Sequence, residues 1–173
     1  LGRPTGRNAP LGLFQRRLLI GPLAPNPPGI EDQGLKWLQP RHQRRYQVLT
    51  IGREGATNVL SETTDPAWVE LISGSPVRTD SGQLASVRDD HDNDHRRLFI
   101  NDEPISPIGW DVRAITGVDS NTVFFTACPS HDSWVCDLWS WNAADGLVQL
   151  TVGGWNSGTS RGGTSVISRN SLD

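Results

Sequence analysis

Three short segments of the sequence carry side chains whose types and spacing could support chemistry. The first, GTSRG at residues 158–162, fits the G-x-S-x-G pattern, in which the serine is a nucleophile on a sharp turn from a strand into a helix. The residues after Ser160 are β-branched and predict a strand, and no histidine follows His131 to complete a triad in that chain order. We therefore expect a glycine-rich loop between sheets and assign no catalytic residue here.

The second segment, DDHDNDH at residues 89–95, raises the question of a metal site. Its alternate carboxylates match the first three ligand positions of a calcium loop: Asp90, Asp92 and Asp94. The match then fails, because His95 replaces the required glycine and Asn101 the bidentate glutamate. Zinc would need His91 and His95 on one helix face, or a distant third ligand. Solvated charges between two strands are the simpler explanation, so we assign no metal site.

The third segment, CPSHDSWVC, places seven residues between Cys128 and Cys136. This spacing allows a disulfide across a hairpin if the strand register sets the two cysteines opposite each other. In a cytoplasmic chain the thiols remain reduced and behave as small apolar residues, and we favour this state. Together with His131 they are too few ligands for a zinc knuckle. We assign no cofactor site.

The elements that must position these segments are expected to be strands. No window keeps apolar residues at helical spacing without glycine or proline intruding, whereas short apolar and alternating runs recur. Turn sequences such as DSG, NAADG and GGWNSG separate them. The expected strands are KWLQPRH, RYQVLTIG, TNVLSET, GQLASVRD, RRLFIND, TVFFTAC, VCDLWSW and LVQLT.

The expected strands fall into groups of three that begin near Lys36, Gln83 and Thr122, at intervals of 47 and 39 residues. An interval of ~40–50 residues suits one four-stranded propeller blade. A β-sandwich fits the spacing of single strands but does not explain the grouping. The pattern favours an all-β fold, a partial β-propeller of about three four-stranded blades.

Residues 1–35 do not share this pattern. Seven of the 12 prolines lie in residues 1–40, and such a segment cannot donate a regular ladder of backbone hydrogen bonds. We expect an irregular lead segment rich in proline, glycine and arginine, either poorly packed or translated from a shifted frame that enters the true frame near Trp37. Residues 36–173 are then consecutive blades of an incomplete propeller domain.

The composition gives no support to several classes of protein. A net charge of −3 does not favour binding to nucleic acid or to an anionic membrane. No apolar run approaches the ~18 residues of a membrane span, and the start has neither a Met nor a signal-peptide pattern. We expect a cytoplasmic chain without its natural start. Arginine supplies 15 of the 16 basic residues, which suggests GC-rich coding DNA.

Three motifs, in this order, carry a family resemblance: ETTDPAWVEL, DVRAITGVD (interpreted as a crossover between blades) and the blade ending LTVGG. With their flanks they cover about residues 37–173. This region resembles the N-terminal propeller of dipeptidyl-peptidase IV-like serine peptidases of the prolyl oligopeptidase type, especially bacterial, actinobacterial members. The resemblance implies a fragment of a longer enzyme that releases dipeptides from the N-termini of peptides.

In that family the catalytic Ser, Asp and His lie in a C-terminal α/β-hydrolase domain, and paired acidic residues of the propeller bind the substrate amine. This sequence contains no Glu-Glu pair, so the resemblance transfers no catalytic or amine-binding residue. It implies a non-catalytic gate and scaffold whose partners are the hydrolase domain of the parent chain and peptide substrates. A non-enzymatic propeller that serves as an interaction platform is the alternative, because one fold supports both roles.

The remaining expectations concern packing. Four tryptophans are expected to fill space between blades: Trp68, Trp110, Trp139 and Trp141. In the crossover at residues 64–70, Asp65 is expected to close a turn, Trp68 to be buried, and Val69 and Leu71 to begin the next strand. A cluster of arginines is expected to form a solvated rim: Arg41, Arg44 and Arg45.

Overall fold

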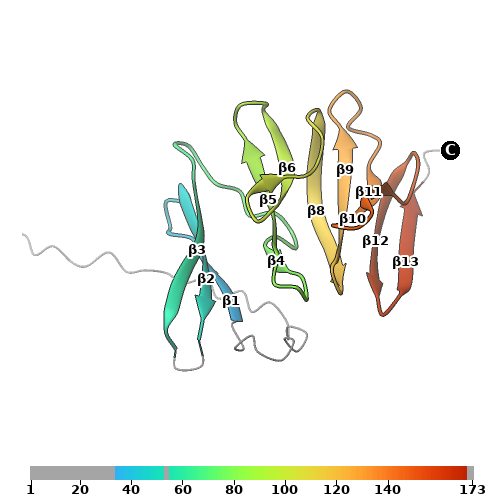
Figure 1. Cartoon of the computed structure of the whole chain (residues 1–173). Coiled ribbons are helices and arrows are strands. Elements are labelled where there is room, and N and C mark those ends of the chain that lie inside the picture. The colour runs from blue at the N-terminus through green and yellow to red at the C-terminus, as the bar shows by residue number, and fades with distance from the viewer. Residues whose placement is uncertain (1–33, 53–54, 171–173) are drawn as a thin grey trace, which may run out of the picture. The chain divides into compact units, whose positions relative to one another are not determined.

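The computed structural model describes residues 34–52 and 55–170, which form thirteen β-strands and no helix (Figure 1). The strands form four antiparallel sheets, which confirms the all-β prediction. Most of the expected lead segment, residues 1–35, lies outside the described residues, and its last two residues already belong to the first strand. The described residues divide into two compact units, 34–69 and 70–170.

The first unit is a three-stranded sheet. Its strands follow chain order: β1 (Gly34–Leu38), β2 (Arg45–Ile51) and β3 (Thr57–Thr64). The central strand alternates buried and less buried residues, with Tyr46, Val48 and Thr50 on its buried face. This period of two is the pattern of a strand with one covered face, and the strands match the first expected trio.

The second unit contains two four-stranded sheets, each with its strands in chain order, as in a propeller blade. One sheet comprises β4 (Val77–Arg78), β5 (Leu84–Asp90), β6 (His95–Ile100) and β7 (Glu103–Pro104). The other comprises β8 (Trp110–Asp119), β9 (Thr122–Pro129), β10 (Asp137–Asn142) and β11 (Gly146–Gln149). These sheets correspond to the second and third expected groups.

The core of this unit lies between the two four-stranded sheets. Phe125 and Leu98 are fully buried there, and β9 buries six consecutive residues, 123–128. A strand that is buried on both faces carries a continuous apolar run, which is why TVFFTAC is conspicuous in the sequence. The ring centroids of Trp110 and Trp139 lie 4.1 Å apart, and the planes of the two rings are tilted by 49° to each other.

Strand β8 was not expected. The motif DVRAITGVD is not a crossover but most of this strand, which pairs with β9 along its whole length. The register shifts between Val112 and Ala114 and again between Ile115 and Gly117. Each bulge moves the next side chain to the other face, so the alternation that identifies a strand in a sequence is lost.

The last sheet of the second unit is a hairpin of β12 (Trp155–Arg161) and β13 (Thr164–Asn170). GGWNSG was expected to be a turn, but its last four residues, from Trp155, already belong to β12. The turn of this hairpin is Gly162-Gly163, with φ of 58° and 76° at the two residues. Two successive positive φ values are what a type I′ hairpin turn requires, and glycine supplies them without strain.

The crossover at residues 64–70 is partly as expected. The Oδ1 of Asp65 accepts hydrogen bonds from the backbone N–H groups of Ala67 at 2.6 Å and Trp68 at 2.8 Å, which confirms the predicted turn. The prediction of a buried Trp68 is wrong, because this side chain is 58% exposed. Val69 is buried, but no strand begins at Val69 or Leu71.

Candidate functional site

The serine of the GTSRG motif is a buried strand residue. Ser160 lies near the end of β12 and is 6% exposed. Its hydroxyl donates a hydrogen bond to Asp119 Oδ2 at 3.3 Å. The backbone N–H of Gly163 donates to the same oxygen at 2.9 Å. These contacts, the N–H of Gly163 first, lower the pKa of Asp119 below its usual value. No helix follows the strand, so the nucleophile elbow is absent; the expected loop is also wrong, since the motif lies mostly on β12.

Close packing and turn geometry explain why glycine occupies two positions of the motif. A Cβ at Gly158 would lie 2.6 Å from the carbonyl oxygen of Val166 and 2.9 Å from Cδ2 of Leu138. Gly158 therefore lets β12 pack closely on β10, and Gly162 makes the hairpin turn. Strand packing and turn geometry account for the glycines of the G-x-S-x-G match.

The segment at residues 89–95 forms the hairpin between β5 and β6. The Oδ2 of Asp90 accepts from Arg97 Nη1 at 3.0 Å and from Asn93 Nδ2 at 2.9 Å. Arg97, followed by Asn93, lowers the pKa of Asp90. Within residues 34–52 and 55–170, no group of three or more His, Cys, Asp or Glu side chains is arranged to hold a metal ion.

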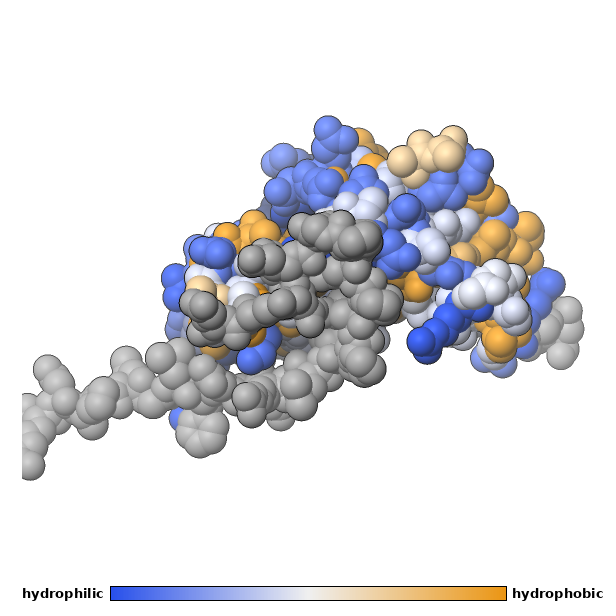
Figure 2. Space-filling model, turned by 60° about the horizontal axis from the view of Figure 1, so that its bottom comes forward, coloured by the Kyte–Doolittle hydropathy of each residue, from blue (hydrophilic) through white to orange (hydrophobic). Residues whose placement is uncertain are grey.

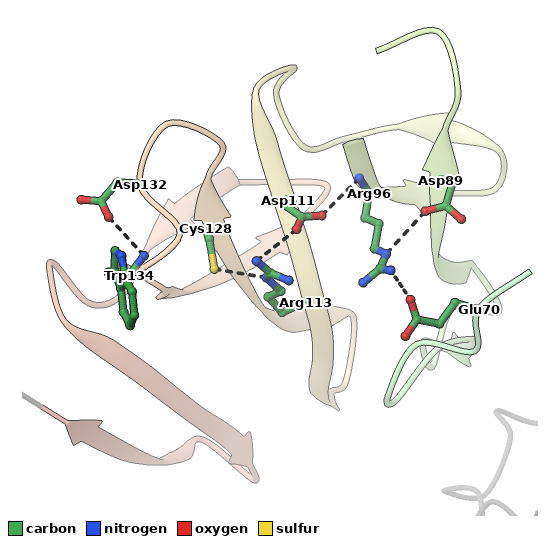
Figure 3. A network of polar contacts seen from close by, with 8 residues as sticks. All are labelled: Glu70, Asp89, Arg96, Asp111, Arg113, Cys128, Asp132 and Trp134. Carbon is green, nitrogen blue, oxygen red and sulfur yellow. Dashed lines mark hydrogen bonds and ion pairs between the residues drawn. The ribbon is translucent and has the colours of Figure 1, made fainter. Parts of the chain in front are cut away.

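A row of polar side chains instead connects the two four-stranded sheets (Figure 3). We call it the polar row: Glu70, Asp89, Arg96, Asp111, Arg113 and Cys128. The Arg96 guanidinium bonds to Glu70 and lies 3.4 Å from Asp89 Oδ1 through Nε. The backbone N–H of Arg96 donates to Asp111 Oδ1 at 3.4 Å, which joins β6 to β8.

The polar row continues from β8 to β9. Arg113 Nη2 lies 3.3 Å from Asp111 Oδ2, and Arg113 Nε donates to Cys128 Sγ at 3.5 Å. Each carboxylate of the row therefore faces an arginine, which suits a clip between neighbouring sheets more than a free amine-binding site. Its one nucleophilic atom is the sulfur of Cys128.

Sequence reasoning missed Asp111 and Arg113 because it took their segment as a crossover. One signal in the sequence points to these two residues: in DVR, one charged residue stands on each side of Val112, which is fully buried. On a strand such alternation places both charges on one face, and Cys128 lies opposite Asp111 in the β8–β9 pairing. Only the pairing of distant segments reveals the contact with sulfur.

The aromatic and arginine expectations have mixed outcomes. Trp110, Trp139 and Trp141 pack against the core cluster as expected. The expected arginine rim is exposed, and Arg45 lies 3.9 Å from Glu62. Hydrophobic side chains also reach the surface of the second unit toward its C-terminal end, on the right of Figure 2. They include Val152, Trp155, Val166 and Ile167, on or next to β12 and β13.

The described part of the chain contains no helix whose length and hydropathy would suit a membrane crossing. No protein-family model matches the sequence, and no curated protein matches it either. Among solved structures, the fold is similar to that of dipeptidyl peptidase 4 from Porphyromonas gingivalis, with a TM-score of 0.63 and 18% sequence identity. The match covers 79% of this chain and 21% of that chain, so this sequence spans about a fifth of the neighbour. The comparison shows the fold, a propeller-like arrangement of β-sheets.

Proposed function

We propose that this chain is the non-catalytic propeller portion of a serine exopeptidase that releases dipeptides from peptide N-termini. The observation that carries the proposal is the agreement of two likenesses, one in sequence motifs and one in fold. The order of the ETTDPAWVEL, DVRAITGVD and LTVGG motifs resembles the dipeptidyl-peptidase IV propeller, and the fold is similar to a dipeptidyl peptidase 4 over 79% of the chain.

The proposed role is that of a gate and scaffold beside a C-terminal α/β-hydrolase domain. The environment of Ser160 supports the assignment of catalysis to the other domain. Its hydroxyl is hydrogen-bonded to Asp119, and the residue lies on a strand and not on the sharp turn that a nucleophile requires. The partners we propose are the hydrolase domain of the parent chain and peptide substrates. The exposed arginine rim is suited to face that domain, since arginine forms forked bonds with carboxylates.

We also propose a cytoplasmic setting and a bacterial, actinobacterial source. The free state of both cysteines agrees with a reducing compartment. The use of arginine for 15 of the 16 basic residues agrees with GC-rich coding DNA.

The test is to extend the reading frame beyond Asp173 and to assay the protein that it encodes. We expect an in-frame G-x-S-x-G between a strand and a helix, followed by Asp and His, and hydrolysis of dipeptidyl-prolyl or dipeptidyl-alanyl reporter substrates. Serine-to-alanine substitution in that distal motif should abolish turnover, whereas Ser160→Ala, as the matched control, should leave turnover unchanged in folded protein. Further blades that end at a stop codon would instead select an interaction platform.

A further inference from the structure

Cys128 and Cys136 face each other where β9 and β10 separate. The β9–β10 pairing sets Asp137 opposite Ala127, and the next position of this antiparallel register sets Cys136 opposite Cys128. Both side chains are 1% exposed, and both thiols are free. The condition that the sequence left open, a register that opposes the two cysteines, is therefore met.

The backbone hydrogen bonds of Cys136 show which kind of cross-strand pair the two cysteines form. Its N–H donates to the carbonyl of Gly154 at 2.9 Å, and its carbonyl accepts from the N–H of Asn156 at 2.8 Å. Both groups thus bond away from β9, so the two cysteines occupy a non-hydrogen-bonded pair, in which opposed Cα atoms lie ~4.5 Å apart. Disulfides span Cα separations of ~4.4–6.8 Å, so a bond between the sulfurs needs little movement of the backbone.

Arg113 donates a hydrogen bond to one of the two sulfurs, that of Cys128 (Figure 3). Its Nε lies 3.5 Å from Cys128 Sγ, and Asp111 holds the other side of the guanidinium at 3.3 Å. The Cys136 thiol, followed by Arg113, lowers the pKa of Cys128 to about 6. The same contact with Cys128, followed by burial, raises the pKa of Cys136. At neutral pH the pair therefore consists of one nucleophilic thiolate and one thiol.

We propose that Cys128 and Cys136 are a reversible redox pair that hydrogen peroxide oxidises to an intramolecular disulfide, with Arg113 as a positioning residue for Cys128. A small oxidant suits the burial of both sulfurs. The proposal is independent of the proposed peptidase role.

The reaction balances in two steps. The Cys128 thiolate attacks one oxygen of the peroxide, the O–O bond breaks, and the released hydroxide takes a proton from solvent to become water. Cys128 is then a sulfenic acid. The Cys136 sulfur attacks the Cys128 sulfur, the S–S bond forms, and the sulfenic hydroxyl leaves with the Cys136 proton as a second water. Two thiols and one peroxide give one disulfide and two waters, and a dithiol reductant restores the thiols.

The first test measures the intact mass of the native full chain during treatment with hydrogen peroxide. We expect a loss of about 2 Da that dithiothreitol reverses, and a rate that rises with pH through a midpoint of about 6. Cys136→Ser should stop at a gain of about 16 Da that dimedone traps, and Cys128→Ser should show neither change. Two thiols that still alkylate after denaturation, or disulfides formed only between molecules, would overturn the proposal.

The second test separates positioning by Arg113 from a general effect on folding. Arg113→Gln should slow oxidation roughly five- to tenfold at neutral pH, with little change at pH 10, where the attacking Cys128 thiol is ionised with or without the guanidinium. Arg41→Gln, at an exposed arginine of the first unit, is the matched control and should leave the rate unchanged. Equal slowing by Arg113→Gln at both pH values would refute its positioning role.

Discussion

The two four-stranded sheets and the β12–β13 hairpin all belong to the second unit but differ strongly in how deeply they bury their side chains. Strand β9 buries six consecutive residues, whereas all seven residues of β13 are exposed. Among the described strands, β13 pairs only with β12, and Val166 and Ile167 on it face solvent. A pair of strands becomes stable when further strands extend the sheet and one face of the sheet is covered. Among the described strands, none extends the β12–β13 hairpin, and every residue of β13 is exposed.

This contrast agrees with a propeller, in which each blade buries its faces against its neighbours. The β4–β7 and β8–β11 sheets cover each other, while β12 is held to β8 and β10 by small residues and hydrogen bonds. We therefore expect the stability of the second unit to reside in the paired sheets and the hairpin to contribute little. The predictions that follow begin with the largest expected effect; they test this division and, at Trp68 of the first unit, the low cost of removing an exposed aromatic side chain.

Phe125→Ala should cause the largest loss. The ring is fully buried on β9, and emptying such a site costs ~3–5 kcal/mol because the transfer free energy is lost and a cavity remains. Ile167→Ala on β13 is the control and should change the free energy of unfolding by less than about 0.5 kcal/mol. Urea denaturation followed by tryptophan fluorescence measures both, and similar losses would break the comparison.

Asn156→Ala should give an intermediate loss, because this side chain links the stable region to the hairpin. Its Nδ2 donates to the carbonyls of Gly153 at 2.8 Å and Cys136 at 3.2 Å, and the residue is 1% exposed. The carbonyl of Cys136 keeps its bond from the backbone N–H of residue 156, whereas that of Gly153 loses its donor, and such a loss costs roughly 1–3 kcal/mol. Asn170→Ala, at an exposed position on β13, should have almost no effect on the same denaturation curve.

Trp68→Ala should cost less than about 1 kcal/mol, because more than half of this side chain is already in contact with solvent. This value replaces the ~3–5 kcal/mol that a buried tryptophan would imply. Calorimetric melting of the wild type and the variant measures the difference. A loss as large as that of Phe125→Ala would contradict this expectation and would indicate that Trp68 is buried in the folded protein.

Asp119→Asn should produce the smallest effect, and that effect should depend on pH. The folded-state pKa of Asp119 is depressed, chiefly by the N–H of Gly163, so the ionised carboxylate stabilises the hairpin above the unfolded pKa of about 3.9. This contribution is lost as the pH falls through the folded pKa. Wild type and variant should therefore differ in melting temperature at pH 7, and the difference should shrink as the pH falls through the folded pKa; a constant difference would contradict the assignment.

The sequence predicts the strands that alternate regularly or bury both faces, and it fails where local pattern and tertiary context disagree. RYQVLTIG and TVFFTAC correspond to β2 and β9 because their apolar residues match a strand period. Strand β8 was missed because two bulges interrupt its alternation, and β12 because its serine, threonine and glycine residues are typical of loops. Two-residue strands such as β4 and β7 carry no detectable period.

The candidate site was less predictable than the fold. Cys128 and Cys136 were recognised from their spacing, but the register that opposes them and the approach of Arg113 depend on three strands meeting. Ser160 drew attention by its motif, yet Asp119, 41 residues away, determines what its hydroxyl does. Contacts between residues so distant in sequence are set by strand pairing, which local patterns do not encode.

Hydrogen–deuterium exchange of the native protein, read residue by residue, tests the central contrast most directly. Amides of β9 should open only in global unfolding, whereas amides of β13 should exchange by local opening of the hairpin. We predict exchange at least about 100-fold slower for β9 than for β13 at the same pH and temperature. Equal protection of the two strands would show that the hairpin is as stable as the paired sheets, and would contradict the account.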